Sequence, residues 1–250
     1  MRILYVFPHP DDESFGPAPG MARQLREGHE VHLLTLTRGG ATRERHRQGL
    51  SVQEMGRVRL KEMREVESVL GLTSMTVLDL PDSGLAEMDP RDIEAEVRAH
   101  IRSLDPDVVV TYAVHGISGF HDHLVTHAVV KRVYCELRHP EDRPRRLALF
   151  TLAEVEEGEL EGEKEEDGKQ ETGEGGAGRK LHTSPRSAID VTEEVSEADL
   201  AAGRAALECY RTYQDVIRRA DPLGRVGSTL YFELFQESHS PPLPSITAGL

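Results

Sequence analysis

Short apolar runs alternate along the chain with longer segments in which apolar residues recur every three or four positions. The apolar runs, typical of strands buried in a parallel sheet, lie at residues 2–7, 30–37, 75–80, 107–112 and 146–153. The amphipathic segments predict helices at residues 19–28, 51–70, 91–103, 122–138 and 196–219. This alternation predicts a single α/β domain of Rossmann-like type, with a mostly parallel sheet flanked by helices.

The ends of these elements carry recognisable signals. Ser51 and Glu54 have the spacing of a capping box at the start of the second helix, and Gly71 is placed to end it. Residues 187–192 (SAIDVT) predict an extended segment, and the proline-rich tail after residue 237 predicts irregular structure that packs on a neighbouring element.

Residues 154–180 break the pattern, because they are rich in Glu and Gly and contain almost no large apolar side chains. Such a segment buries too little surface to offset its loss of conformational entropy. The composition favours a mobile surface insertion, and an acidic interaction or lid element is the alternative.

Composition narrows the classes of function. The formal net charge of -14 disfavours nucleic-acid binding, which needs a basic surface. Cys135 and Cys209 form no metal-binding or disulfide pattern, and we expect both to be buried free thiols. No apolar run approaches the roughly 20 residues of a membrane span, and the N-terminal residues lack the features of a signal peptide. The sequence therefore predicts a cytoplasmic protein.

The first candidate site is HPDDE, residues 9–13, which follows the first strand directly. Ligands in open parallel sheets bind beyond the carboxyl ends of the strands. An imidazole and a carboxylate are typical ligands of Zn²⁺ or a similar divalent ion. Pro10 stiffens the turn, so Asp11 and Asp12 can take different roles, one as a metal ligand and the other as a base.

An isolated Pro-Asp-Asp sequence is usually a turn or a helix N-cap. Here a buried strand leads into the sequence, a histidine precedes it, and a second histidine cluster follows downstream. Convergent polar groups of this kind favour a functional site over a simple turn.

The second candidate site is HGISGFHDHLVTH, residues 115–127, which follows the fourth predicted strand and should reach the same edge of the sheet. It holds four of the twelve histidines. His123 and His127 are spaced i, i+4 on a predicted helix, as two metal ligands would be. For His127 a packed or surface helical side chain is the favoured interpretation, since the first site already supplies ligands.

HPDDE after the first strand, with a glycine-rich turn ending in Asp-His after a later strand, resembles the LmbE/PIG-L family of zinc-dependent N-acetylglucosaminyl deacetylases. The resemblance covers most of the chain outside residues 154–180. Supporting matches are TRGG, RLKE, PDSGL and IDVT, at residues 37–40, 59–62, 81–85 and 189–192.

The resemblance implies a hydrolase that removes an N-acetyl group from an N-acetylglucosamine-type substrate, with Zn²⁺ or another divalent metal as cofactor. It implies that His9, Asp12 and His123 bind the metal and that Asp11 is the general base. A small amino-sugar conjugate is then the expected substrate, and the resemblance is compatible with a homo-oligomer joined through apolar parts of the C-terminal tail.

The resemblance also implies that Arg59 and Asp82 hold the sugar. On the residues alone, Arg59 lies among other charges on a predicted helix, so a solvated helix face or a local ion pair is the alternative.

The sequence departs from the family at one place. The family pattern is His-Pro-Asp-His, in which the first His assists the tetrahedral intermediate or protonates the leaving amine. Here Phe120 takes the place of that His and His121 the place of the Pro. The catalytic role then falls to His121 from the adjacent position, or it passes to Asp11 or His115.

Three other functions remain open on the sequence. A metal-dependent hydrolase of a different amide or ester fits the same residues, and so does a family member that binds metal but has lost catalysis. A nucleotide- or sugar-binding module without chemistry is disfavoured, because residues 8–14 (PHPDDES) lack the pattern G-x-G-x-x-G. They also place two negative charges where phosphates would bind.

Overall fold

One seven-stranded sheet runs through the computed structural model, which describes residues 1–138, 143–154 and 180–250. The strand order is β3-β2-β1-β4-β5-β7-β6. The first five strands are parallel to one another, and β7 is antiparallel to both of its neighbours. The strands are β1 (Arg2–Phe7), β2 (Glu30–Thr37), β3 (Ser74–Leu80), β4 (Val108–Tyr112), β5 (Arg146–Thr151), β6 (Val191–Glu194) and β7 (Thr229–Leu234). The predicted mostly parallel α/β sheet is confirmed.

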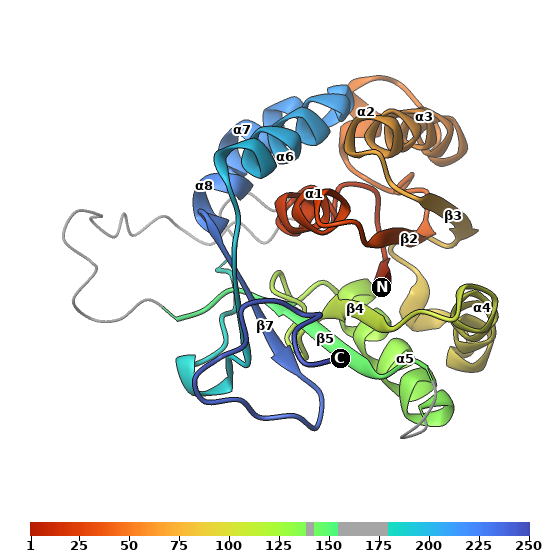
Figure 1. Cartoon of the computed structure of the whole chain (residues 1–250). Coiled ribbons are helices and arrows are strands. Elements are labelled where there is room, and N and C mark those ends of the chain that lie inside the picture. The colour runs from red at the N-terminus through yellow and green to blue at the C-terminus, as the bar shows by residue number, and fades with distance from the viewer. Residues whose placement is uncertain (139–142, 155–179) are drawn as a thin grey trace.

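Helices cover both faces of this sheet (Figure 1). They are α1 (Ala18–Arg26), α2 (Glu44–Arg47), α3 (Val52–Leu70), α4 (Pro90–Leu104), α5 (His121–Leu137), α6 (Glu197–Cys209), α7 (Gln214–Ala220) and α8 (Pro222–Val226). In α3 the predicted capping box of Ser51 and Glu54 is present, and Gly71 ends the helix with a left-handed φ of 71°.

The core is divided in two by the sheet, as β1 illustrates. Ile3, Tyr5 and Phe7 point into one apolar cluster, and Leu4 and Val6 point into the other. This alternation is the period of two expected of a strand. The first cluster lies under α1, α3 and α6, and the second lies under α4 and α5 (Figure 1). Both faces of β1 are therefore buried, which fixes the direction in which residues 8–15 leave the sheet.

The predicted helix at 196–219 is wrong as a single element. α6 ends at Cys209, because Tyr210 leaves the helical conformation with ψ of 67°. A 3-10 turn at Arg211–Tyr213 and then α7 follow. Two tertiary contacts explain the break: the Tyr210 hydroxyl donates to buried Glu13, and Glu62 on α3 accepts hydrogen bonds from the backbone N–H and the hydroxyl of Thr212.

The sequence analysis missed β7, although residues 229–234 alternate between buried and half-buried side chains. The predicted strand at 146–153 ends at Thr151, and the extended segment at 187–192 is a 3-10 turn followed by β6. These differences lie in the part of the sheet where the chain reverses direction, and there the simple βα alternation no longer applies.

The C-terminal tail packs on its own chain. Residue Leu243 forms an isolated bridge with Val191, Ile246 is fully buried, and Arg146 donates to the carbonyls of Ile246 and Ala248. Ile246 is therefore not available for contacts between subunits.

Of the two cysteines, Cys209 is buried as expected, but Cys135 is exposed. Cys135 lies on the solvent side of α5, so the expectation of a buried thiol is wrong there. Most of the predicted acidic insertion, residues 155–179, lies outside the described residues.

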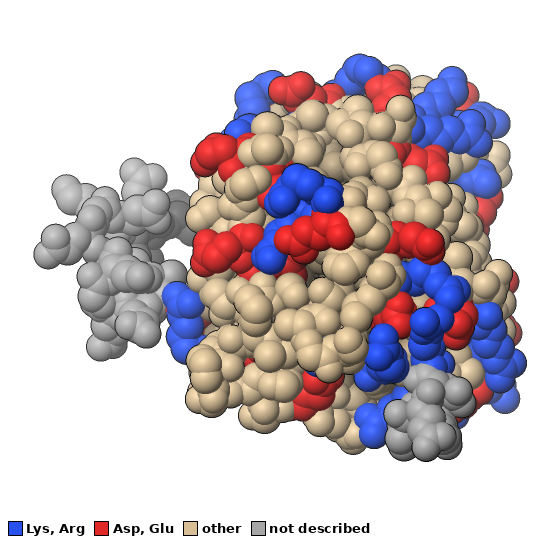
Figure 2. All heavy atoms as spheres, viewed as in Figure 1, with Lys and Arg blue, Asp and Glu red and all other residues tan. Residues whose placement is uncertain are grey.

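The face of the molecule drawn in Figure 2 mixes acidic and basic side chains at close range rather than presenting a field of one sign. Within the described residues, no helix is long and apolar enough to cross a membrane.

Candidate active site

The site lies at the point of the sheet where the strand order reverses, between β1 and β4. β1 and β4 are adjacent, but the strands on the β1 side continue with β2 and those on the β4 side with β5. Such a switch point leaves a crevice beyond the carboxyl ends of the two strands. The loops that follow β1 and β4 carry the two predicted clusters, so the fold brings residues 9–13 and 115–123 together.

The turn after β1 is held in an unusual conformation. Asp11 has a φ of 87°, in the region that residues other than glycine rarely adopt, and its carbonyl accepts hydrogen bonds from the backbone of Ser14 and Phe15. Gly39, with a φ of 62°, lets the 38–41 loop approach Pro10: a Cβ there would lie 2.9 Å from Pro10 Cδ. The strained turn directs the carboxylates of Asp11 and Asp12 toward different partners.

His9, Asp12 and His123 each present one ligand atom, and these atoms all lie within 4.8 Å of one another. His9 Nδ1 is 3.4 Å from Asp12 Oδ2, and His123 Nε2 is 3.3 Å from Asp12 Oδ1. Asp12 and His123 are 5% exposed. The structure therefore brings the three predicted ligands together from the turn after β1 and the first turn of α5, about 110 residues apart in the sequence.

The His123 imidazole is oriented so that its Nε2 faces Asp12. Its Nδ1 lies 2.9 Å from the carbonyl of Gly116, so that nitrogen is the donor and the lone pair is on Nε2. Gly116 is required for this contact, because a Cβ at that position would lie 2.7 Å from the Cβ of His123. The Tyr112 ring stacks on the imidazole at 4.5 Å, and its hydroxyl donates to Asp12.

Asp122 orients His9 from the opposite side. Its Oδ2 lies 3.1 Å from His9 Nε2 and also accepts a hydrogen bond from the backbone of Ser83, while its Oδ1 accepts one from Leu85. His9 Nε2 is therefore the donor and Nδ1 faces Asp12. A carboxylate behind a histidine ligand is a common support in metal sites.

The charges of the cluster suit a cation. Burial lowers the pKa of His9, but hydrogen bonds to Asp12 and Asp122 outweigh burial and raise that pKa to about 10. Burial raises the pKa of Asp12, but His123 and His9 lower it well below its usual range. Three carboxylates, those of Asp12, Asp82 and Asp122, surround the one imidazole of His9. The site attracts a positive charge, either a proton or a divalent ion that displaces it.

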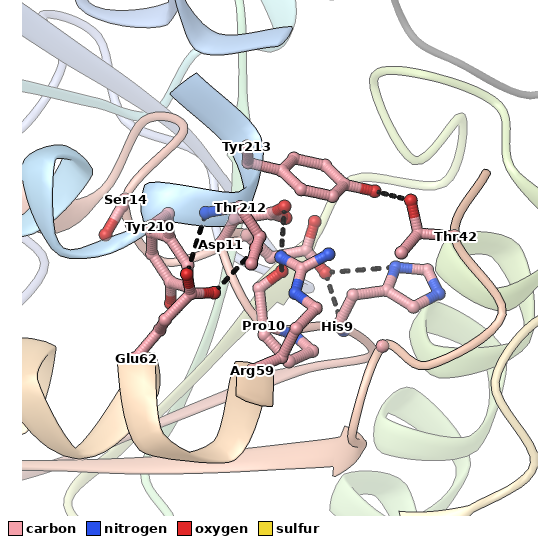
Figure 3. Close-up of polar contacts among 12 residues, drawn as sticks. His9, Pro10, Asp11, Ser14, Thr42, Arg59, Glu62, Tyr210, Thr212 and Tyr213 are labelled. Atoms are coloured by element: carbon pink, nitrogen blue, oxygen red, sulfur yellow. Dashed lines mark hydrogen bonds and ion pairs between the residues drawn. The ribbon is translucent and has the colours of Figure 1, made fainter. Parts of the chain in front are cut away.

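Asp11 lies beside this cluster and is held by Arg59. Arg59 Nη2 donates to Asp11 Oδ2 at 2.6 Å and to the carbonyl of Pro10 at 2.8 Å. The Arg59 guanidinium also lies 4.0 Å from the centroid of the Tyr213 ring (Figure 3). Burial raises the pKa of Asp11 to about 6, against the opposing effect of Arg59. Arg59 is 2% exposed, so the alternative of a solvated helix face is excluded.

Asp82 is tied to the loop that follows β2. Its Oδ2 accepts a hydrogen bond of 2.6 Å from the backbone of Ala41, and its Oδ1 lies 3.4 Å from His9 Nε2. Both Arg59 and Asp82 line the main cavity, but each already has a protein partner there.

The other three histidines of residues 115–127 differ in their surroundings. His121 is exposed, begins α5 and lines the cavity. Phe120 lines the cavity beside it and packs edge-on against His123 at 5.6 Å. His115 accepts from the backbone of Ile117 and faces Ser184 and Thr151, which ties two loops together. His127 is buried and hydrogen-bonded to the carbonyl of Tyr112, as the interpretation of a packed helical side chain predicts.

All of the predicted site residues border one cavity of about 360 Å³. It is lined by His9, Asp11, Asp12, Arg59, Asp82, His121 and His123 together with residues from the 41–44 loop, β4, β5, α7 and α8. The volume falls within the range of about 300–1,000 Å³ that is usual for small-molecule sites. Side chains that could hold a metal ion, a neighbouring carboxylate and a substrate-sized space are thus present in one place.

The sequence analysis missed several residues of the site. Tyr112 and Tyr213 carried no motif, and Glu13 was assigned no role, yet it is fully buried and anchors Tyr210. One available signal was overlooked: Arg59 and Glu62 fall on the apolar stripe of α3, among Met55, Met63 and Val66. A charged residue on a buried stripe requires a buried partner.

Comparison with known protein families finds one matching model. The model described as PIG-L, GlcNAc-PI de-N-acetylase, matches residues 4–134, which is just over half of the chain. The matched residues include His9, Asp12 and His123, here called the metal-type cluster. They also include Asp11, Arg59 and Asp82.

Curated relatives carry related names. A 1D-myo-inositol 2-acetamido-2-deoxy-alpha-D-glucopyranoside deacetylase of Geodermatophilus obscurus is 33% identical over 175 residues, 62% of this chain and 60% of that protein. An N-acetylglucosaminyl-phosphatidylinositol de-N-acetylase of Bos taurus is 28% identical over 159 residues, 62% of this chain and 57% of that protein. The matches to the most similar relatives span 50% to 60% of those proteins' own length.

Solved structures share the fold at low sequence identity. An N,N'-diacetylchitobiose deacetylase from Pyrococcus horikoshii has a TM-score of 0.63 at 17% identity, over 94% of this chain and 83% of that one. GalB, the 4-carboxy-2-hydroxymuconate hydratase from Pseudomonas putida, has a TM-score of 0.66 at 13% identity, over 100% and 99%. One fold thus carries both a hydrolase and a hydratase, so the function must be argued from the site.

Proposed function

Because the chain belongs to the PIG-L family of GlcNAc-PI de-N-acetylases, we propose that it is a metal-dependent hydrolase that removes an N-acetyl group from an N-acetylglucosamine-type substrate. One observation carries the proposal. The ligand atoms of His9, Asp12 and His123 lie within 4.8 Å of one another, in the same cavity as the carboxylate of Asp11. The names of the relatives support an amino-sugar conjugate as the substrate.

The donor set fits a divalent metal, and zinc is the ion that we propose. Two imidazoles and one carboxylate are a common protein set for catalytic zinc, and three protein ligands leave a position open for water or substrate. His9 Nδ1, a carboxylate oxygen of Asp12 and His123 Nε2 would hold the ion. When bound, it would polarise the amide carbonyl and make water more acidic.

Asp11 is the proposed general base. Arg59 holds Oδ2 of its carboxylate, which leaves Oδ1 to accept a proton from the attacking water. The water oxygen bonds to the carbonyl carbon, and the carbon–nitrogen bond then breaks. Asp11 returns the same proton to the departing nitrogen, so that acetate and a free amine result. A pKa of about 6, set by burial, suits a group that takes and gives a proton near neutral pH.

His121 is proposed to assist the developing oxyanion from the start of α5. It lines the cavity next to Phe120, which takes the place of the family histidine. His115 is not assigned this role, because its ring is committed to hydrogen bonds with Ile117, Ser184 and Thr151. Asp82 and Arg59 are proposed to border the sugar, with Arg59 also positioning Asp11.

A metal-binding protein with an altered substrate or with lost catalysis is the second candidate. Phe120 favours it, since an apolar ring replaces a catalytic imidazole beside His123. This candidate predicts a bound metal without release of amine from any acetylated sugar.

The test combines metal analysis with amine release from N-acetylglucosamine conjugates, for the parent and for Asp11→Asn. We expect about one metal per chain in both proteins, and a loss of activity of about 10²–10⁴-fold in the variant, the usual contribution of a general base. Metal without activity in the parent would favour the second candidate. A protein that binds no divalent metal even after reconstitution would refute both.

A further inference from the structure

The cavity beside the metal-type cluster has a second wall that the proposed chemistry does not use. This wall, here called the apolar wall, is made of Phe150, Leu152, Leu181, Val216, Pro222 and Val226. All six residues lie outside residues 4–134, the part of the chain that the family model matches. They come from β5, the segment before β6, α7 and α8, so the second half of the chain builds this side of the cavity.

The apolar wall joins the metal-type cluster without a break. Phe150 is 2% exposed and lies 6.4 Å from the Tyr112 ring, which in turn stacks on His123. Gly16 makes room for it: a Cβ at that position would lie 2.5 Å from Phe150 Cζ and 3.6 Å from Val226 Cγ2. A group that extends from the reacting amide along this wall would contact mainly carbon, with Arg225 as a charged residue of the same lining.

Another part of the lining, here called the polar wall, is made of Thr42, Arg43, Glu44, Asp82 and Ser83. Thr42 accepts a hydrogen bond from Tyr213, whose ring stacks on Arg59. Sugar hydroxyls need hydrogen-bond partners when they leave water, and an unpaired one is costly to bury. The sugar therefore fits the polar wall, and the apolar wall needs an occupant without hydroxyl groups.

We propose that the apolar wall binds an alkyl or aryl group carried by the amino-sugar substrate, so that the substrate is a lipophilic amino-sugar conjugate rather than a free N-acetyl sugar. An acetyl methyl group is too small to fill the apolar part of a cavity of about 360 Å³. The chemistry is the same whether the group is a longer N-acyl chain or an apolar aglycone. The proposal rests on the proposed function for the position of the sugar.

The length of the alkyl or aryl group is limited by side chains that separate the main cavity from a second one. Phe150, Leu152, Arg225 and Val226 border both the main cavity and a smaller cavity of about 170 Å³ on their other side. Leu152 is one of the side chains between the two spaces. Shortening it would join the cavities, and enlarging Val226 would narrow the main one.

The test compares two series of substrates: glucosamine with N-acetyl, N-butanoyl and N-octanoyl groups, and N-acetylglucosamine as its methyl, butyl and octyl glycosides. All are kept below their micelle-forming concentrations, and kcat and KM for amine release are measured separately. In at least one series, kcat/KM should rise by up to about fourfold per buried methylene. A rise in the first series alone assigns the group to the acyl side, and a rise in the second alone assigns it to the aglycone side.

Two variants sharpen the test. Leu152→Ala should move the preferred chain length upward. In the series that responds, Val226→Phe should lower the ratio of kcat/KM for the longest member to kcat/KM for the shortest by at least tenfold. The ratio is the measured quantity, because a partly misfolded variant loses activity on all substrates alike. Val69→Ala, at an exposed position of α3, is the matched control and should leave the ratio unchanged.

The proposal is refuted if the parent shows a ratio near one in both series, or if both wall variants keep the parent's ratio. Its failure is distinguishable from failure of the proposed function. Should no substrate release amine, the longest and the shortest members of both series are titrated by calorimetry into the parent and into Val226→Phe. Tighter binding of the longest member in either series, weakened in Val226→Phe, upholds the apolar wall without catalysis, and equal binding of the longest and shortest members in both series overturns it.

Discussion

The two halves of the chain contribute to one cavity in different ways. The first half, up to α5, places the metal-type cluster, Asp11 and Arg59, and each of these side chains is held by directed hydrogen bonds. The second half contributes mainly carbon: Phe150, Val226 and their neighbours on the apolar wall. Directed bonds fix atoms to within a fraction of an ångström, whereas apolar packing fixes shape and tolerates exchange of similar volumes.

The difference separates chemistry from selectivity. The family model ends at residue 134, before the apolar wall begins. Under the proposed function, the reacting groups would follow the family, and residues of the second half would select the group that accompanies the amino sugar. Tyr213 links the two halves at the cavity, because it stacks on Arg59 and donates to Thr42 (Figure 3).

The largest effect is expected from His123→Ala. This change removes a proposed metal ligand of the first half and leaves the apolar wall of the second half unchanged. Removing one of three ligands should abolish both metal binding and amine release, because the remaining two donors hold the ion weakly. Metal content by elemental analysis and the activity are measured together. Binding of the octyl glycoside should persist, since the apolar wall is intact. Full metal content in this variant would contradict the assigned ligand set.

A smaller effect is expected from Arg59→Met, which removes the contact between Arg59 and Tyr213. Without the guanidinium, burial and Asp12 are opposed by His9 but no longer by Arg59, and the pKa of Asp11 rises above its value of about 6. Since Asp11 must be ionised to accept a proton, the acidic limb of the kcat/KM profile should shift to higher pH. Activity at neutral pH should fall on the order of 100-fold, as for loss of a hydrogen bond to a buried charge.

Arg59→Lys is the matched control, because it keeps the charge and loses the paired geometry. The acidic limb of the kcat/KM profile of Arg59→Lys should lie closer to that of the parent. An unshifted limb in Arg59→Met would show that Arg59 does not control Asp11.

A change of about tenfold is expected from His121→Gln, which tests the departure from the family at the start of α5. His121 is exposed, so water can replace part of its contribution to the oxyanion, and the loss stays below that of a buried donor. Adding Phe120→His to this variant should recover activity, because it restores an imidazole at the family position. Metal content should be unchanged in both. No loss in His121→Gln would assign the acid role to Asp11 alone.

The smallest effect on catalysis is expected from Glu193→Gln, at the junction of the two halves. Glu193 on β6 is fully buried, accepts a hydrogen bond from Gln24 on α1, and has its pKa raised to about 7 by burial. Its pKa is higher in the folded than in the unfolded state, so the stabilisation is complete below about pH 4.5 and is lost as pH rises through about 7.

The parent should therefore lose roughly 3 kcal/mol more in the free energy of unfolding than Glu193→Gln between pH 4.5 and 8, from a shift of about 2.5 pKa units. Chemical denaturation at several pH values measures this, and amine release at neutral pH should be unchanged. Parallel pH dependences for the two proteins would contradict the burial of an uncharged Glu193.

The sequence by itself determined the order of the βα units and the location of the chemistry. The alternation of apolar runs and amphipathic segments needed only local periodicity, and it predicted five parallel strands within two residues at each end. HPDDE was recognisable because a strand buried on both faces leads directly into it. The carboxyl ends of parallel strands share one edge of the sheet, so the meeting of His9 with His123 followed from topology.

Only the tertiary structure decided how α6 ends, where β7 pairs, and what Arg59 does. The break at Tyr210 depends on Glu13 and Glu62, which lie about 200 and 150 residues away in the sequence. Arg59 looks like any surface charge until Asp11 and Tyr213 enclose it. The apolar wall has no motif, because packing selects volume and polarity from several distant segments, and local sequence records neither. Long-range contacts of this kind are invisible to periodicity, and they are what shaped the second half of the cavity.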